Sequence, residues 1–202
     1  MHFQSLFLVA MTCSLCWVNA DDGSTSPLIQ LDESGMDSSS EYEEPMGHDL
    51  EDRSVNSFYL QCLKAHNKYR RRHGVPSLVL DRNLNAKARR WAKTMASRNS
   101  LFHSGIKGYG ENLYASWGTQ VTGRNLVDSF YKEIKYYNYN APGFSKKTGH
   151  FTQVVWKSSK AMGVGVAKGS DGGTYVVLVA VLYYPQGNYQ GQFRANVPRP
   201  RY

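Results

Sequence analysis

Cysteine is nearly absent from this sequence, with three residues among 202. Two of them, Cys13 and Cys16, lie in the apolar N-terminal stretch, so loss of that stretch would leave only Cys62. One cysteine cannot form an intramolecular disulfide, and the fold must therefore be stabilised by packing. Cys62 could still form a disulfide between two chains, and weak dimerisation is therefore an alternative.

A hydrophobic run long enough to cross a membrane is also missing. The run from Phe3 to Val18 is interrupted by Thr12 and Ser14 and is shorter than the ~20 residues that a spanning helix needs. It contains no acidic residue and ends in small residues, which is typical of a secretory signal. We therefore expect residues 1–20 to be a cleaved signal peptide and the protein to be secreted to the extracellular space. A membrane anchor is the alternative, and no transmembrane span is expected in the mature chain.

Acidic residues are scarce after residue 53. Residues 54–202 hold 5 of the 16 acids against 23 bases, a charge near +18, whereas residues 21–53 hold 11 acids against the single base Arg53, a charge near −10. The 21–53 segment has few large apolar side chains, and we expect it to be disordered. It could fold back onto the basic domain, be released near Arg53, or act as a solubilising linker. We expect residues 54–202 to form one folded domain.

Several patterns of common active sites do not occur. There is no G-x-S-x-G or H-E-x-x-H pattern, and no glycine pattern of a Rossmann fold or a P-loop. The lone thiol is a poor nucleophile candidate, because Cys62 lies on the apolar stripe of an expected helix over 57–72. The positive charge favours an anionic partner, but the secretory signal and the lack of a groove-reading motif argue against nucleic acid.

Hydrophobic periodicity predicts three helices and a hairpin. The helices are expected over 57–72, from the N-cap Asp81 to 98, and over 123–137. Residues 99–120 lack a helical period, contain four glycines and are interpreted as a loop. Two valine-rich runs, 161–168 and 174–184, flank a glycine-rich turn and predict a β-hairpin buried on both faces. Helices packed on such a sheet give an α+β fold, a three-layer α-β-α sandwich.

Two polar residues stand out in apolar surroundings. Glu133 falls on the core-facing stripe of the third expected helix, where a carboxylate is costly unless it is paired or faces a polar cleft. His150 begins an apolar run, so its ring is held beside the core. With His103 and Glu111 from the expected loop, these residues could bind a metal, act in acid–base chemistry, or simply hydrogen-bond to one another as structure.

Basic residues gather at the end of the first expected helix and opposite the apolar stripe of the second. Such a face is by default solvated, and acidic lipid headgroups or sulfated glycans are the functional alternatives. The candidates for an anion-binding surface are Arg70, Arg71, Arg72, Arg82, Arg89, Arg90 and Lys93.

Two longer motifs resemble those of a known family. Residues 149–156, GHFTQVVW, resemble the first signature of the CAP superfamily of cysteine-rich secretory, antigen 5 and pathogenesis-related proteins, and residues 183–193, YYPQGNYQGQF, resemble its second. Shorter matches are the His-Asn and Tyr-Arg pairs within 66–70, His-Ser at 103–104 and Gly-Glu-Asn-Leu at 110–113. The resemblance spans roughly residues 57–197 and implies an α-β-α sandwich of the CAP/SCP type with a large cleft.

The family's cleft tetrad, carried over position by position, falls on His103, Glu111, Glu133 and His150. The resemblance implies a weak divalent-metal site in which His103 and His150 ligate Zn²⁺. A metal-assisted extracellular hydrolase that uses the tetrad is the alternative. The scarcity of cysteine makes the domain similar to the Golgi-associated branch, although residue 2 is His here rather than the glycine that is myristoylated in that branch.

Family members are also associated with sterol or lipid binding through an aromatic loop after the third helix. The corresponding aromatic residues are Tyr136, Tyr137, Tyr139 and Phe144, for which core packing is the alternative role. The sequence therefore predicts a secreted, non-enzymatic CAP-domain binding protein that engages lipid, sterol or an anionic extracellular surface. It would require no cofactor, with zinc as an optional ligand of the cleft.

Overall fold

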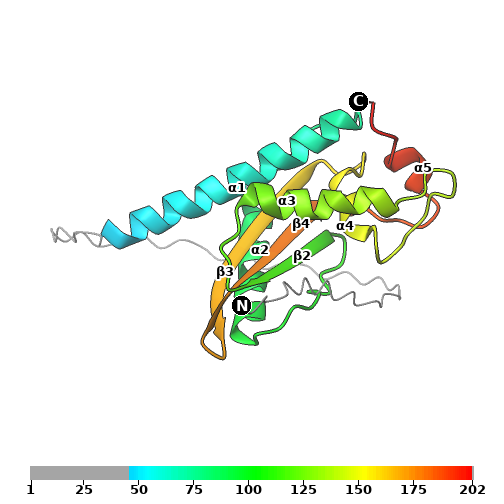
Figure 1. The fold of residues 1–202 in the computed structure, drawn as a ribbon. Coiled ribbons are helices and arrows are strands. Elements are labelled where there is room, and N and C mark those ends of the chain that lie inside the picture. The colour runs from blue at the N-terminus through cyan, green and yellow to red at the C-terminus, as the bar shows by residue number, and fades with distance from the viewer. Residues whose placement is uncertain (1–45, 202) are drawn as a thin grey trace, which may run out of the picture.

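A computed structural model describes residues 46–201, with side chains from residue 53 onward. The expected signal peptide and most of the acidic segment lie outside the described residues. The first helix, α1 (Met46–Arg72), begins earlier than expected, so its first residues fall inside the 21–53 segment that was expected to be disordered. These first turns extend past the rest of the domain (Figure 1).

The centre of the fold is a four-stranded sheet in the order β1-β3-β4-β2. Its strands are β1 (Val79–Leu80), β2 (Gly110–Trp117), β3 (Ala161–Asp171) and β4 (Thr174–Tyr184). The expected hairpin is confirmed: β3 and β4 pair from Ala161↔Tyr184 to Asp171↔Thr174, and Gly172 and Gly173 turn with φ of 54° and 82°. Positive φ at both positions is what a two-residue hairpin loop requires, and glycine adopts it without strain.

Helices cover both faces of the sheet, which makes the expected three-layer α-β-α sandwich (Figure 1). On one side lie α1, α3 (Gly123–Tyr131) with the 3₁₀ turn η1 (Lys132–Tyr136) that continues it, and α4 (Gly149–Val154). On the other side lies α2 (Arg82–Ser97), with Asp81 as its N-cap. A short α5 (Phe193–Asn196) follows the sheet. We refer to the two sides as the α1 side and the α2 side.

Strand register decides which residues face which side. In β4, Val177, Val179, Val181 and Tyr183 belong to the core on the α1 side, whereas Val176, Leu178, Ala180 and Leu182 belong to the core on the α2 side. Directly opposed residues of an antiparallel pair share a face. Asn112, opposite Val181, therefore faces the α1 side, and Glu111, opposite Leu182, faces the α2 side.

The two sides are packed differently. The α1 side is filled by large aromatic rings, among them Tyr131, Phe151 and Trp156. On the α2 side the helix rests directly on β3, because a Cβ at Gly165 would lie 2.1 Å from the backbone carbon of Ala88. The α2 layer thus depends on the absence of side chains at its contact with the sheet.

Strand β2 is a correction to the sequence analysis, which interpreted 99–120 as a loop. The strand is bounded by Gly110 and Gly118, and its polar residues obscured the alternation that marks a strand. It is also an edge strand with a single partner, β4, and edge strands carry more polar residues than central ones. The helix expected over 123–137 is likewise shorter and ends in the 3₁₀ turn that holds Glu133.

Candidate cleft site

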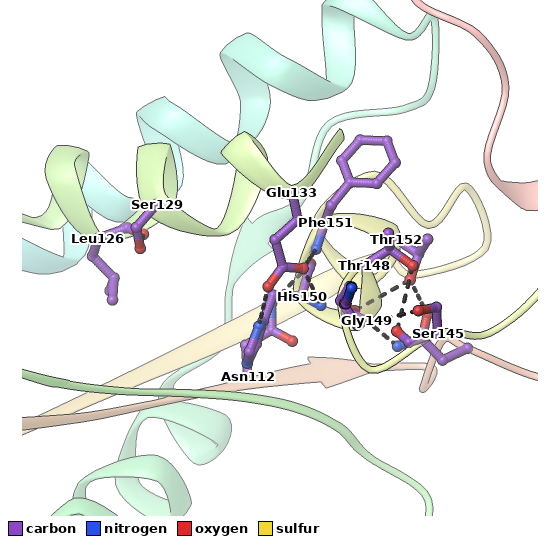
Figure 2. A network of polar contacts seen from close by, with 12 residues as sticks. Asn112, Leu126, Ser129, Glu133, Ser145, Thr148, Gly149, His150, Phe151 and Thr152 are labelled. Carbon is purple, nitrogen blue, oxygen red and sulfur yellow. Dashed lines mark hydrogen bonds and ion pairs between the residues drawn. The ribbon is translucent and has the colours of Figure 1, made fainter. Parts of the chain in front are cut away.

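Glu133 organises the inner half of the site (Figure 2). One of its carboxylate oxygens lies 2.7 Å from Nδ1 of His150, and the other accepts the backbone N–H groups of His150 at 3.0 Å and Phe151 at 3.1 Å. These two amides belong to the first turn of α4, where backbone donors have no partner within the helix. A single carboxylate therefore satisfies the start of α4 and orients the imidazole, which explains why a glutamate occupies the core-facing stripe.

The ring of His150 is fixed from a second direction. Phe130, at the end of α3, stacks on it with a centroid separation of 5.0 Å and an interplanar angle of 14°. With Nδ1 directed to Glu133, the structure gives Nε2 no hydrogen-bond partner among the described residues. The site thus presents one ring nitrogen of a half-buried and oriented histidine.

A buried polar chain supports His150 from within the α1 side. The side-chain amide of Asn112 donates to the backbone oxygen of His150 and to the hydroxyl of Tyr183, both at 3.1 Å. The Tyr183 hydroxyl lies 2.8 Å from Nε2 of His66, whose Nδ1 lies 2.8 Å from the carbonyl oxygen of Cys62. Because a carbonyl only accepts, Nδ1 of His66 carries a proton. When Nε2 is unprotonated it accepts from the Tyr183 hydroxyl, and a neutral His66 then gives every group of the chain a partner.

Burial sets the protonation of this chain. Desolvation lowers the pKa of His66 to about 4, and the cation of Arg70 acts in the same direction. Desolvation also raises the pKa of the Tyr183 hydroxyl well above its usual value. Both groups are neutral near pH 7, so the chain positions His150 and carries no charge of its own.

The second pair, His103 with Glu111, is more exposed to solvent than the first, and we call it the outer pair. Nδ1 of His103 lies 2.6 Å from Oε1 of Glu111, and the same oxygen accepts the backbone N–H of Ser104 at 3.0 Å. The side chain of His103 is 48% exposed and that of Glu111 is 9% exposed. The Glu111 carboxylate is thus held by the loop and by the strand, while its histidine faces solvent.

The four predicted residues accordingly form two His–Glu pairs. Neighbouring residues of β2 connect the two pairs, since Glu111 belongs to one pair on the α2 side and Asn112, facing the α1 side, donates to the backbone of His150 in the other. Within residues 46–201, no group of three or more His, Cys, Asp or Glu side chains is close enough to hold a metal ion.

The aromatic candidates divide in two. Tyr136 and Phe144 are 59% and 52% exposed. Tyr137 is buried against Phe151, and the Tyr139 ring packs edge-on against Tyr137 at 4.8 Å. Core packing, the alternative role expected from the sequence, therefore describes buried Tyr137 and partly buried Tyr139, whereas Tyr136 and Phe144 remain the exposed candidates.

Arg70 is a further correction, because it is 0% exposed and cannot belong to an anion-binding surface. Its guanidinium donates to four backbone oxygens of other segments, those of Pro76, Val154, Trp156 and Ser159. Burial lowers its pKa to about 10, which leaves it charged at neutral pH. The other six basic candidates, Arg71, Arg72, Arg82, Arg89, Arg90 and Lys93, are exposed.

Most carboxylates of the domain already have structural partners. Asp81 caps α2, Asp128 accepts the hydroxyl of Tyr69 at 2.7 Å, and the two glutamates belong to the His–Glu pairs. Asp171, at the tip of the hairpin, is the remaining one of the five acids in 54–202. The surface charge of the domain is therefore almost purely positive.

Sequence reasoning missed the supporting residues of the site. His66 and Tyr183 lie within motifs that carried the family resemblance, but nothing in their spacing marked them as partners across 117 positions. Asn112 follows Glu111 directly, and only the strand register shows that the two side chains face opposite sides of the sheet.

The model of the CAP, or cysteine-rich secretory protein, family matches residues 63–184. This chain belongs to the CAP family. The matched range contains both His–Glu pairs and the whole sheet from β1 to β4.

Among the relatives of this CAP domain is the Golgi-associated plant pathogenesis-related protein 1 of Homo sapiens, 46% identical over 150 residues that cover 71% of this chain and 94% of that protein. Another is the pathogenesis-related protein PR-1 type of Sambucus nigra, 39% identical over 132 residues, 63% of this chain and 76% of that protein. The solved structure of NaASP2 with Zn²⁺ matches with a TM-score of 0.54 at 18% identity, covering 71% of this chain and 86% of that one, which confirms the fold.

No helix within residues 46–201 is both long and apolar enough to cross a membrane.

Proposed function

We propose that this CAP domain is a secreted, non-enzymatic binding module that docks on anionic lipid surfaces through the segment 132–147. The observation that carries the proposal is the exposure of Tyr136 and Phe144 beside four exposed lysines. These lysines are Lys132, Lys135, Lys146 and Lys147.

This combination suits a membrane interface for physical reasons. Aromatic side chains enter the boundary between headgroups and acyl chains, and each nearby lysine adds about 1 kcal/mol of attraction to an anionic leaflet. The Lys135 ammonium lies 4.8 Å from the centre of the Tyr136 ring, so charge and apolar surface share one location. The remaining positive charge of the domain would add a long-range attraction.

The segment is held in place by its buried members. Tyr137 and Tyr139 fix its first half, and the backbone N–H of Thr148 donates to the carbonyl of Ser145 at 3.0 Å near its end. The ring of Phe144 packs near Gly149, where an added Cβ would lie 3.2 Å from it. Docking would therefore need little ordering of the loop, and ordering is a main cost of binding.

Vesicle sedimentation tests the proposal. At low salt we expect the mature chain to bind phosphatidylserine vesicles and to bind phosphatidylcholine vesicles at least tenfold more weakly. Phe144→Ala should weaken binding to phosphatidylserine vesicles at least tenfold. Trp117 is an exposed aromatic residue at the C-terminal end of β2, outside the 132–147 segment, and Trp117→Ala should change the same binding less than twofold. Equal binding to both vesicles, or equal effects of the two substitutions, would contradict the proposal.

Sterol and sulfated glycan are the other ligand classes expected from the sequence. Adding cholesterol to phosphatidylcholine vesicles separates sterol recognition from headgroup charge. Competition by heparin at constant ionic strength separates glycan binding from lipid binding. Anionic lipid docking predicts binding to phosphatidylserine vesicles that needs no cholesterol and that persists in the presence of heparin.

Zinc is proposed as a weak ligand of the His–Glu pairs. What supports it is the pairing of Nδ1 of His103 and of His150 with a carboxylate, an arrangement that orients the opposite ring nitrogen in metal sites. Calorimetric titration with Zn²⁺ should give a heat of binding that is lost in a His103→Ala, His150→Ala variant. Identical titrations of the two proteins would leave the pairs with a structural role alone.

Hydrolysis is the alternative activity and predicts turnover of a peptide or ester that chelators and His150→Ala abolish. A cysteine nucleophile is disfavoured, because Cys62 is fully buried and burial raises the pKa of its thiol. We therefore propose binding as the function and expect no turnover above that of the His150→Ala variant.

A further inference from the structure

The exposed face of α2 is a second cationic surface, distinct from the 132–147 segment. Its sequence, RNLNAKARRWAKTMAS, contains no acidic residue, and Ala86, Arg89, Arg90 and Lys93 line a shallow hollow on it. Large exposed aromatic residues are absent from the described face of this helix, where Trp91 is partly buried against Phe102. This surface has charge without the apolar anchors of the 132–147 segment.

Like charges on this face repel one another. Lys93 lies four positions after Arg89 and three positions after Arg90, spacings at which side chains of a helix are neighbours. No carboxylate of the helix relieves the repulsion, and four of the five acids in 54–202 are engaged elsewhere. An anion in the hollow would remove an unfavourable interaction as well as form new ones.

The chemistry of the hollow favours carboxylates. Arg89 and Arg90 supply guanidinium groups, which bind carboxylates with two parallel hydrogen bonds, whereas the cations of the 132–147 segment are lysines that act as point charges. Of the two cationic surfaces, the α2 face is thus better suited to an acidic polypeptide.

The same chain supplies such a polypeptide. Residues 21–45 contain eight acids, Asp21, Asp22, Asp32, Glu33, Asp37, Glu41, Glu43 and Glu44, and no lysine or arginine. At up to about 3.5 Å per residue, its 25 residues can span roughly 85 Å from the start of α1 at Met46. That reach exceeds the length of α1, about 40 Å at 1.5 Å per residue, so the segment is long enough to return over the domain from the first residue of α1. Tethering also gives the segment an effective concentration in the millimolar range.

We propose that the acidic segment 21–45 docks intramolecularly on the α2 face, with its carboxylates paired to Arg89, Arg90 and Lys93. Docking neutralises the α2 face, which lacks exposed aromatic residues, and leaves the 132–147 segment as the cationic surface that is available to other partners. The inference goes beyond the proposed lipid binding and does not depend on it, because the intramolecular contact exists without vesicles.

Zero-length carbodiimide cross-linking of the full mature chain, followed by peptide mass spectrometry, tests the proposal. The reagent joins a carboxylate to a lysine in direct contact, and Lys93 is the lysine of the hollow. At 20 mM salt we expect links from residues 21–45 to Lys93 to exceed those to Lys146 and Lys147 at least fivefold. Because the contact is ionic and exposed, 0.5 M salt should reduce them at least fivefold.

Matched charge reversals complete the experiment. Arg89→Glu with Arg90→Glu should reduce the Lys93 links at least fivefold, whereas Lys146→Glu with Lys147→Glu should leave them unchanged. Both pairs are exposed, and unchanged thermal unfolding checks that each variant is folded. Links spread evenly over the surface lysines, or Lys93 links that persist in the Arg89→Glu, Arg90→Glu variant, would overturn the proposal. Vesicle binding by the same variants is measured separately, so failure of lipid docking is distinguishable from failure of this contact.

Discussion

The two sides of the sheet are both covered by helices, but different kinds of residues pack on each. The α1 side combines large aromatic rings with a buried polar chain that ends at His150, and it holds the Glu133 pair. The α2 side has small residues in direct backbone contact, and its His103–Glu111 pair opens to solvent at the histidine. The α1 side is therefore the more specific structure, and the α2 side offers a rigid helix whose outer face is free to carry charge.

The largest expected effect concerns the close contact on the α2 side. Gly165→Ala should lower the free energy of unfolding by about 4 kcal/mol, because the added Cβ would lie 2.1 Å from backbone of α2 and the helix must move away. Urea unfolding followed by circular dichroism measures the change. Gly169→Ala on the same strand is the matched control, since its Cβ would have no neighbour closer than 3.6 Å, and should change stability by less than ~0.5 kcal/mol. Equal effects would show that α2 is not seated by glycine.

The two glutamates of the site should differ in their contribution to stability. Glu133→Ala removes the acceptor of two backbone amides at the start of α4 and should cost about 3 kcal/mol. Glu111→Ala removes one such acceptor beside an exposed histidine and should cost about 1 kcal/mol. Chemical unfolding of the two variants measures the difference, and a larger loss for Glu111→Ala would reverse the assignment of inner and outer pairs.

Acid should destabilise the domain through the α1 side. The folded pKa of His66, about 4, lies below its usual value of 6.5, so the unfolded chain binds the proton first. The stability that this group contributes is complete above pH 6.5 and is lost as the pH falls toward 4, by about 3 kcal/mol in total. Burial lowers the pKa of His73 as well, which adds to the same slope. Unfolding measured from pH 7.5 to 4 should show a shallower slope in His66→Gln, and an unchanged slope would refute this origin.

The smallest expected effect is that of a substitution on the α2 side on lipid binding. Replacing Arg82 by Gln should change affinity for phosphatidylserine vesicles by less than threefold, because this residue supplies charge without an anchor. Lys146→Gln, beside exposed Phe144, should weaken binding more, by about fivefold. Sedimentation at 0.1 M salt compares the two, and a larger effect of Arg82→Gln would place the membrane on the opposite side.

Local pattern was sufficient to predict much of the fold. The valine runs predicted β3 and β4, and Asp81 was predicted to cap α2. The position of Glu133 on an apolar stripe predicted a carboxylate that is either paired or faces a polar cleft, and the structure shows it paired. These features depend on residues close in sequence or on a single strong conflict with burial.

Features that depend on distant partners could not be predicted in the same way. Arg70 resembled a surface cation because it adjoins Arg71 and Arg72, yet its four acceptors lie up to 89 positions away. Tyr137 and Tyr139 could not be separated from Tyr136 without the core that receives them. Strand β2 is defined by its pairing with β4, and its own glycines and polar residues favoured a loop.

A spin label tests the central claim, that the α1 side meets the membrane, most directly. Cys62 is fully buried, so Ala141→Cys and Ser97→Cys each place one reactive thiol on the surface, the first in the 132–147 segment and the second at the end of α2. Both variants keep Tyr136 and Phe144. Electron paramagnetic resonance with oxygen and a nickel chelate as relaxation agents measures the depth of each label in phosphatidylserine vesicles. We expect the label at position 141 to be shielded from the nickel chelate and accessible to oxygen, whereas the label at position 97 remains in water. A label at 97 that is as deep as the one at 141, or deeper, would refute docking through the α1 side.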